Sequence, residues 1–320
     1  LKAVISDLSG NEVTYGALEM RTNVGLVSLY DLTSVGDKAG FEVVTSGNHM
    51  AVSAPYSDQT GNNQGAIYIY EKSKGAWEYK ETLLRTGAND TDFYGQSLAM
   101  DGTTLVVGCQ NCEGSGRVYV YSYDGTSWTN EVNLVPSSHT VTTGDTYGVS
   151  VDIDGTKIIV GASYTDSGEG SAFIFNFNGS SWVEEVELKS SNNSGFDMFG
   201  AAVAISGDRV IIGAPDRGVC AGGSGAAYSY YYDGSSWGAE QYFESGNDAS
   251  FACGGTMNYG AAVDIDGDKL IIGEPRGYGI ASMYMSTGAV YVFKHNGTTF
   301  VKEASFALAD EADNTYFGTK

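Results

Sequence analysis

Aspartates recur in this chain a few residues ahead of paired aromatic and glycine residues, and this spacing could support metal chemistry. Several carboxylates in neighbouring loops, together with loop carbonyls, would offer Ca²⁺ the roughly six to eight oxygens that it requires. The alternative is that each aspartate only caps a turn and solvates its own loop. The candidate cation ligands are Asp90, Asp92, Asp145, Asp197 and Asp248 in these loops, with Asp264, Asp266 and Asp268 around one Asp-Gly turn.

A second group of residues could bind an organic ligand, because it combines carboxylates, arginines and tyrosines in loops of differing length. Carboxylates and tyrosine rings suit the hydroxyl groups and apolar faces of sugars. The candidate ligand-binding residues are Tyr56, Asp58, Tyr164, Asp166, Asp216, Arg217, Glu274, Arg276 and Tyr278.

Residues for catalysis are harder to assemble. The three histidines lie at different positions of the repeat, and the sequence has no His-Glu-x-x-His or P-loop motif. Its one Gly-x-Ser-x-Gly string, at 234–238, lies at an Asp-Gly turn and not in the strand-to-helix turn of a nucleophile elbow. A polysaccharide lyase would need a tyrosine or histidine base beside cations that neutralise a uronate, and Tyr278 with Arg276 and Arg217 is the combination to test. The sequence therefore favours a binding protein over an enzyme and indicates no catalytic residue.

The elements that position these residues follow from a repeated pattern of glycines. In 147–188, four short runs rich in β-forming residues are separated by turn residues, and no helical period is present. The same unit recurs at intervals of 52 to 60 residues, which is typical of a β-propeller with four strands per blade. The module openings are Gly40, Gly95, Gly148, Gly200 and Gly260, and the third strands are expected after Gly65, Gly116, Gly170, Gly225 and Gly288.

We therefore expect an all-β fold, a single β-propeller domain over residues 1–320 built from four-stranded antiparallel blades. Six blades give the simplest ring, and a seven-bladed ring is the alternative. The first module is degenerate: residues 3–17 match the first two strands and 25–30 match the third. The expected repeats are approximately 1–39, 40–94, 95–147, 148–199, 200–259 and 260–320.

The spacings also predict two unlike faces. The distances across the first and third turns are the same in every complete module, whereas the second-to-third-strand and inter-blade connections vary in length. In an antiparallel blade these two classes of connection lie at opposite ends. Because rigid scaffolds usually carry function on loops of variable length, we expect any ligand on the variable face.

Composition limits the partners and the compartment. The net charge of −22 and the scattered 17 Lys and Arg residues disfavour nucleic acid. No apolar run is long enough for direct membrane insertion. Cys109 with Cys112 and Cys220 with Cys253 are expected to form disulfides, which indicate an oxidising compartment. Glycosylation sequons at Asn89, Asn178, Asn192 and Asn296 agree with an extracellular or cell-surface location.

The aromatic-Gly openings, such as Tyr147-Gly148 and Phe199-Gly200, and the later Gly213-Ala214-Pro215 resemble FG-GAP repeats. The resemblance implies a propeller similar to that of integrin α subunits and of bacterial and algal surface proteins. It also implies calcium loops at the first turns, but here only Asp152/Asp154 and Asp264/Asp266/Asp268 offer more than one carboxylate, in turns too short to wrap an ion.

The expected function is thus extracellular recognition or adhesion, with a protein or glycan ligand at a cell surface or in a matrix bound by the variable face. Ca²⁺ is the cofactor to test, in a supporting role. The alternatives are a lyase-like, polysaccharide-active propeller and a structural propeller within a larger cell-surface protein.

Overall fold

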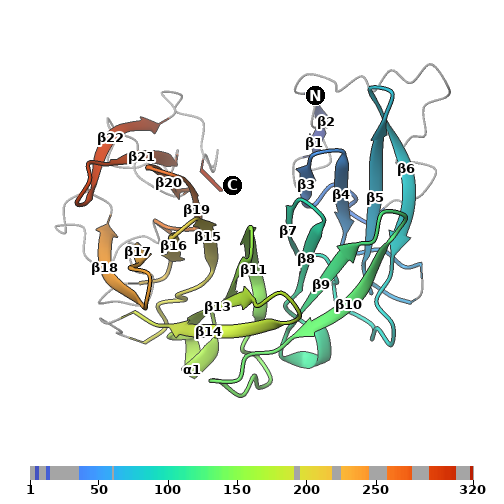
Figure 1. The fold of residues 1–320 in the computed structure, drawn as a ribbon, viewed down its shortest axis with the longest axis horizontal. Coiled ribbons are helices and arrows are strands. Elements are labelled where there is room, and N and C mark those ends of the chain that lie inside the picture. The colour runs from blue at the N-terminus through green and yellow to red at the C-terminus, as the bar shows by residue number, and fades with distance from the viewer. Residues whose placement is uncertain are drawn as a thin grey trace.

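Five four-stranded antiparallel sheets make up the fold (Figure 1). The computed structural model describes residues 4–6, 12–14, 36–59, 61–190, 195–217, 225–244, 258–275, 288–307 and 318–319. The first three blades are β3–β6 (Val43–Ser46, His49–Ala54, Ala66–Ser73, Ala76–Leu83), β7–β10 (Ser97–Asp101, Thr104–Cys109, Arg117–Tyr123, Trp128–Leu134) and β11–β14 (Tyr147–Asp154, Lys157–Ala162, Ser171–Phe177, Trp182–Leu188). The last two are β15–β18 (Ala202–Ser206, Arg209–Ala214, Ala226–Tyr232, Trp237–Glu244) and β19–β22 (Ala262–Asp266, Lys269–Glu274, Ala289–His295, Phe300–Ala307).

These blades follow one another around an arc, each with its first strand toward the centre and its fourth strand outside (Figure 1). The all-β propeller and the four-strand unit predicted from the glycine spacing are thereby confirmed. A two-stranded antiparallel sheet, β1 (Val4–Ser6) and β2 (Glu12–Thr14), lies where the sequence places the first two strands of the degenerate module. The number of blades in the complete ring stays a prediction.

The hydrophobic core lies between adjacent blades. Ile159 of the third blade clusters with Val210 and Ile212 of the fourth, and Ile211 of the fourth clusters with Leu270 and Ile272 of the fifth. The second strands of the third and fourth blades, β12 and β16, are buried on both faces, which explains why they are continuously apolar and do not alternate. A blade with a neighbour on either side is therefore stabilised mainly by those two neighbours.

Glycine spacing is fixed by close approach of successive blades. A Cβ built on Gly161 would lie 1.9 Å from the carbonyl oxygen of Gly200, and one on Gly213 would lie 1.9 Å from that of Gly260. The backbone of each aromatic-Gly opening thus presses against the second strand of the preceding blade. No larger residue fits at the two second-strand positions.

Turns on the constant face are bonded from blade to blade. Each first turn is a two-residue hairpin whose first loop residue is a glycine with a φ of +55° to +57°, as a type II′ turn requires. The side chain that precedes the glycine accepts a hydrogen bond from the turn glycine of the next blade: Asp101 Oδ2 from Gly155 N at 2.8 Å, and Asp154 Oδ2 from Gly207 N at 2.5 Å. The constant face is consequently a chain of linked turns.

Within the described residues, no helix has the length and apolar character needed to cross a bilayer.

Candidate functional site

Three connections of the variable face enclose a pocket beside the third blade. They are the loop between β10 and β11, the connection between β12 and β13 that contains the single turn α1 (Thr165–Gly168), and the loop between β14 and β15. The pocket has a volume of about 540 Å³. This blade-3 pocket is lined by His139, Thr140, Thr142, Thr143, Gly144, Asp145, Tyr164, Asp166, Ser167 and Phe196.

Asp145 holds the loop between β10 and β11, the first wall of the blade-3 pocket, in place. Its carboxylate accepts hydrogen bonds from the Thr142 N–H at 2.5 Å and from the Thr142 hydroxyl at 3.1 Å, and it lies 3.3 Å from His139 Nε2. Its backbone carbonyl accepts a hydrogen bond from Tyr164 N. A buried aspartate therefore closes its own loop and anchors the second wall to it.

Backbone hydrogen bonds join the second wall, which is the connection between β12 and β13, to the third wall, which is the loop between β14 and β15. Met198 N donates to Gly168 O at 3.0 Å, and Phe199 N donates to Glu169 O at 3.1 Å. Gly168 faces the ring of Phe196, because a Cβ on this glycine would lie 3.0 Å from Phe196 Cδ1. The loops that form the pocket are thus tied to one another as well as to the blades.

Phe196 is the residue of the pocket that the fold explains least. Its side chain is 71% exposed, and its φ of +59° lies in the left-handed region that costs a bulky residue free energy. It lies three residues before Phe199, and the equivalent residues of three other modules, Gly36, Thr91 and Gly144, also have positive φ. The left-handed backbone is therefore a general feature of this loop position, whereas the large exposed ring is particular to Phe196.

Phe196 is not among the residues predicted from the sequence, and of its inter-blade loop only Asp197 was a candidate. The signal that was available is the alignment of this position on the following aromatic-Gly pair, where a large apolar residue replaces the glycine or threonine of other modules.

Tyr164 and Asp166, two predicted ligand-binding residues, do lie together in the pocket. The Tyr164 side chain is 42% exposed. Asp166 has a positive φ of +51° and pairs with Lys189 Nζ at 2.6 Å. The hydrogen bond from Lys189 lowers the pKa of Asp166, so this carboxylate is ionised and its charge is balanced by the lysine.

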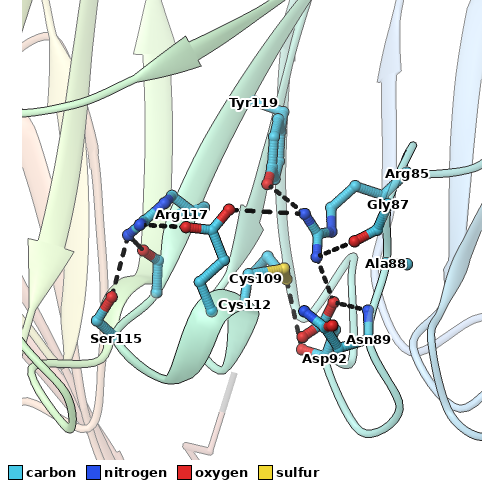
Figure 2. Close-up of polar contacts among 12 residues, drawn as sticks. Arg85, Gly87, Ala88, Asn89, Asp92, Cys109, Cys112, Ser115, Arg117 and Tyr119 are labelled. Carbon is cyan, nitrogen blue, oxygen red and sulfur yellow. Dashed lines mark hydrogen bonds and ion pairs between the residues drawn. A yellow bond between two sulfur atoms is a disulfide. The ribbon is translucent and has the colours of Figure 1, made fainter.

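The corresponding loops of the second blade are filled by their own ionic network (Figure 2). Arg85 Nη2 lies 2.5 Å from Asp92 Oδ2 in a buried ion pair, and Arg85 Nη1 donates to the Tyr119 hydroxyl at 3.2 Å. Glu113 lies 3.9 Å from Arg85 and pairs with Arg117. Here the loops bind one another, whereas in the third blade they leave a pocket with exposed aromatic rings.

Comparison with known proteins bears on this architecture. The FG-GAP repeat model matches residues 77–121, 128–175 and 182–230, which span most of the second to fourth blades. These three stretches are FG-GAP repeats. No curated protein sequence matches the chain.

Two solved structures are similar at low sequence identity. The β-propeller domain of the trilobed protease from Pyrococcus furiosus, described as having an open velcro topology, is 11% identical, with a TM-score of 0.42 and coverage of 82% of this chain and 70% of that chain. A functionally unknown protein from Desulfotomaculum acetoxidans is 9% identical, with a TM-score of 0.48 and coverage of 85% and 70%.

Outside the blade-3 pocket, the predicted ligand-binding residues of the FG-GAP propeller are dispersed. Tyr56 packs against the ring of Phe93, and Asp58 accepts a hydrogen bond from Asn63 N at 2.6 Å. The remaining residues belong to later blades. Asp216 lies 3.3 Å from Asn258 Nδ2, Arg217 stacks on Tyr242 and pairs with Asp197, and buried Glu274 accepts a hydrogen bond from Tyr291, whereas Arg276 and Tyr278 lie outside the described residues.

The predicted cation ligands have protein partners of their own. Asp92, Asp145 and Asp197 occupy one position of the FG-GAP repeat, are buried, and face Arg85, His139 and Arg217, respectively. Asp90 accepts a hydrogen bond from Asn62 N, Asp264 from Ile265 N, and Asp268 lies 3.8 Å from Lys294 Nζ; Asp266 ends β19, and Asp248 lies outside the described residues. Among the described residues no three His, Cys, Asp or Glu side chains form a metal-binding group. Calcium binding by these residues stays a prediction.

Of the two predicted disulfides, one lies within the described residues and the other lies outside them. Cys109 and Cys112 form a disulfide, and both are buried beside the ionic network of the second blade. Cys220 and Cys253 lie outside the described residues, so their pairing stays a prediction.

Proposed function

We propose that this protein is an extracellular binding module that recognises a glycan or protein ligand through the variable face of its propeller. The observation that carries the proposal is the blade-3 pocket, where two exposed aromatic residues, Tyr164 and Phe196, stand on loops that are tied together. Exposed aromatic rings in a concave, rigid setting are typical of binding sites.

The two faces of the molecule support this assignment. Turns of the constant face use their side chains to bond the next blade, as Asp101 and Asp154 do. On the variable face, the loops of the third blade leave a hollow. An extracellular location agrees with the FG-GAP repeats, which are typical of extracellular proteins, and with the Cys109–Cys112 disulfide.

The proposal can be tested by placing one bulky glycan on either face of a protein whose native sequons at Asn89, Asn178, Asn192 and Asn296 have been changed to Gln. Thr140→Asn creates an Asn-Val-Thr sequon at the rim of the pocket, and Asp124→Asn creates an Asn-Gly-Thr sequon in a third turn of the constant face. Both variants would be secreted from eukaryotic cells and assayed for binding to immobilised glycans and matrix proteins. We expect the Thr140 variant to lose binding and the Asp124 variant to retain it.

The opposite pattern would place recognition on the constant face. Equal binding by both glycosylated variants would show that the ligand does not approach the blade-3 pocket. Mass spectrometry of the secreted proteins verifies that each new sequon carries its glycan.

A further inference from the structure

The side chains of the blade-3 pocket indicate the class of ligand. Its surface combines two aromatic rings with the hydroxyl groups of threonines and of Ser167. A pyranose has the matching combination, because one face of its ring presents C–H groups and its edge carries hydroxyls. The C–H groups pack on the electron-rich face of an aromatic ring, and the hydroxyls exchange hydrogen bonds with polar side chains.

The charged residues at the blade-3 pocket narrow the class of ligand further. No lysine or arginine is among the described residues that line the pocket, and the whole chain carries a net charge of −22. A uronic acid or sulfated sugar would therefore approach Asp145 and Asp166 with no lining cation to balance it, because Lys189 lies outside the lining and already pairs with Asp166 and Glu187. A cationic amino sugar gains little either, because Lys189 already pairs with Asp166 and His139 already contacts Asp145.

The exposure of Phe196 supplies a further argument that the ring serves a ligand. The side chain is 71% exposed and so gains little burial from its position, and the equivalent residues Gly36, Thr91 and Gly144 adopt the same left-handed φ without a large apolar side chain. The loop conformation therefore does not require an aromatic ring here. The adjoining Gly168 at φ +95° leaves room for the phenylalanine ring.

We propose that the blade-3 pocket binds a neutral saccharide, with a pyranose ring packed on Phe196 and Tyr164. This inference rests on the proposed binding function and names its ligand class. The pocket volume of about 540 Å³ lies within the range of roughly 300 to 1,000 Å³ that is common for small-molecule sites.

Saturation-transfer NMR with single sugars tests this ligand class directly. The panel would contain the methyl glycosides of glucose, galactose and mannose, N-acetylglucosamine, glucuronic and galacturonic acids, and glucosamine. We expect transfer to at least one neutral sugar, strongest at the C–H protons of one ring face, and none to the uronic acids.

Phe196→Gly and Tyr231→Ala are the decisive pair of variants. Phe196→Gly removes the ring and suits the local φ, so the melting temperature should be unchanged or raised while sugar binding falls at least tenfold. Tyr231, 44% exposed on β17, is a matched aromatic control whose replacement should leave binding intact.

Each other outcome would overturn the inference in a recognisable way. Binding of acidic or amino sugars in place of neutral ones would show that the ligand class is wrong. Neutral-sugar binding that survives Phe196→Gly would place the saccharide elsewhere. If no sugar binds but a matrix protein is still blocked by the Thr140→Asn glycan, the saccharide proposal fails and the binding function stands.

Discussion

Buried and half-buried aspartates serve this propeller in two ways that depend on their partners. Asp92 faces Arg85 and lies within an ionic network, so its negative charge is compensated inside the protein. Asp152 instead accepts hydrogen bonds from two backbone N–H groups, those of Ile153 and of Ile205 in the next blade, each at 2.8 Å. Backbone dipoles compensate a buried charge less fully than a guanidinium does.

Desolvation by burial therefore raises the pKa of Asp152 to about 6, and the two N–H groups only partly oppose this shift. The folded pKa lies above the unfolded value of about 3.9, so folding favours the protonated form. The contribution of Asp152 to the free energy of unfolding is fully present below about pH 4, where the carboxyl group is protonated in both states. It is lost as the pH rises through about 6, where the carboxyl group ionises in the folded protein. A shift of about two units corresponds to roughly 3 kcal/mol of unfolding free energy.

Asp152→Asn tests this linkage, because an asparagine can still accept a hydrogen bond and cannot ionise. The variant loses one of the two acceptor oxygens at every pH. Between pH 4 and pH 7, however, the difference in unfolding free energy between variant and wild type should shift in favour of the variant by up to about 3 kcal/mol. Urea unfolding at several pH values measures the difference. Ser150→Ala is the control: it removes the bond from Ser150 Oγ to Gly200 O between the same two blades, and its effect should not vary with pH. A pH-independent Asp152→Asn effect would contradict the assigned pKa.

At the scale of strands and turns, contacts between successive blades determine which residues the repeat requires. Gly213 has no positive φ, so its role is purely steric: it leaves space for the carbonyl oxygen of Gly260. Gly207, six residues earlier, has a φ of +57° with nothing within 4 Å of its absent Cβ. Gly213 is thus required for close packing between blades, whereas Gly207 is required for the conformation of its turn.

These two roles predict that a Gly→Ala substitution lowers the free energy of unfolding by different amounts at the two positions. Gly213→Ala places a methyl group 1.9 Å from a backbone oxygen, so the blades must separate, and we expect a loss above about 4 kcal/mol or no folded protein. Gly207→Ala should cost about 1 to 3 kcal/mol, because alanine seldom adopts the backbone conformation of the first loop residue in a type II′ turn. Urea denaturation monitored by tryptophan fluorescence compares them. Similar small losses would show that the blades are packed more loosely than the structure indicates.

Most of the architecture could be predicted from the sequence because glycine positions record backbone contacts that no other residue permits. The third strands after Gly116 and Gly170 begin where the spacing placed them. The candidate site was only partly predictable. Tyr164 and Asp166 were chosen because they lie in a variable loop, but Phe196 comes from another loop, and the spacing does not reveal which loops meet.

At the scale of the whole molecule, the fifth blade has one face that no described blade covers. Ile159 and Ile211 hold one position of the second strand and are fully buried against the following blade. Ile271 holds the same position in the fifth blade and is 42% exposed, with no following four-stranded blade among the described residues. A six-bladed ring would cover Ile271 as it covers the other two.

Ile271→Ala and Ile211→Ala therefore measure closure of the ring. In a closed ring both side chains are buried between blades, so each substitution should cost about 2 to 5 kcal/mol. On an open edge, Ile211→Ala would still cost that much, but Ile271→Ala would cost about 0.5 kcal/mol or less, because half-exposed surface positions contribute little. Equilibrium unfolding in urea gives both values in the same protein. We expect equal losses, since a propeller whose core lies between blades gains an additional interface by closing.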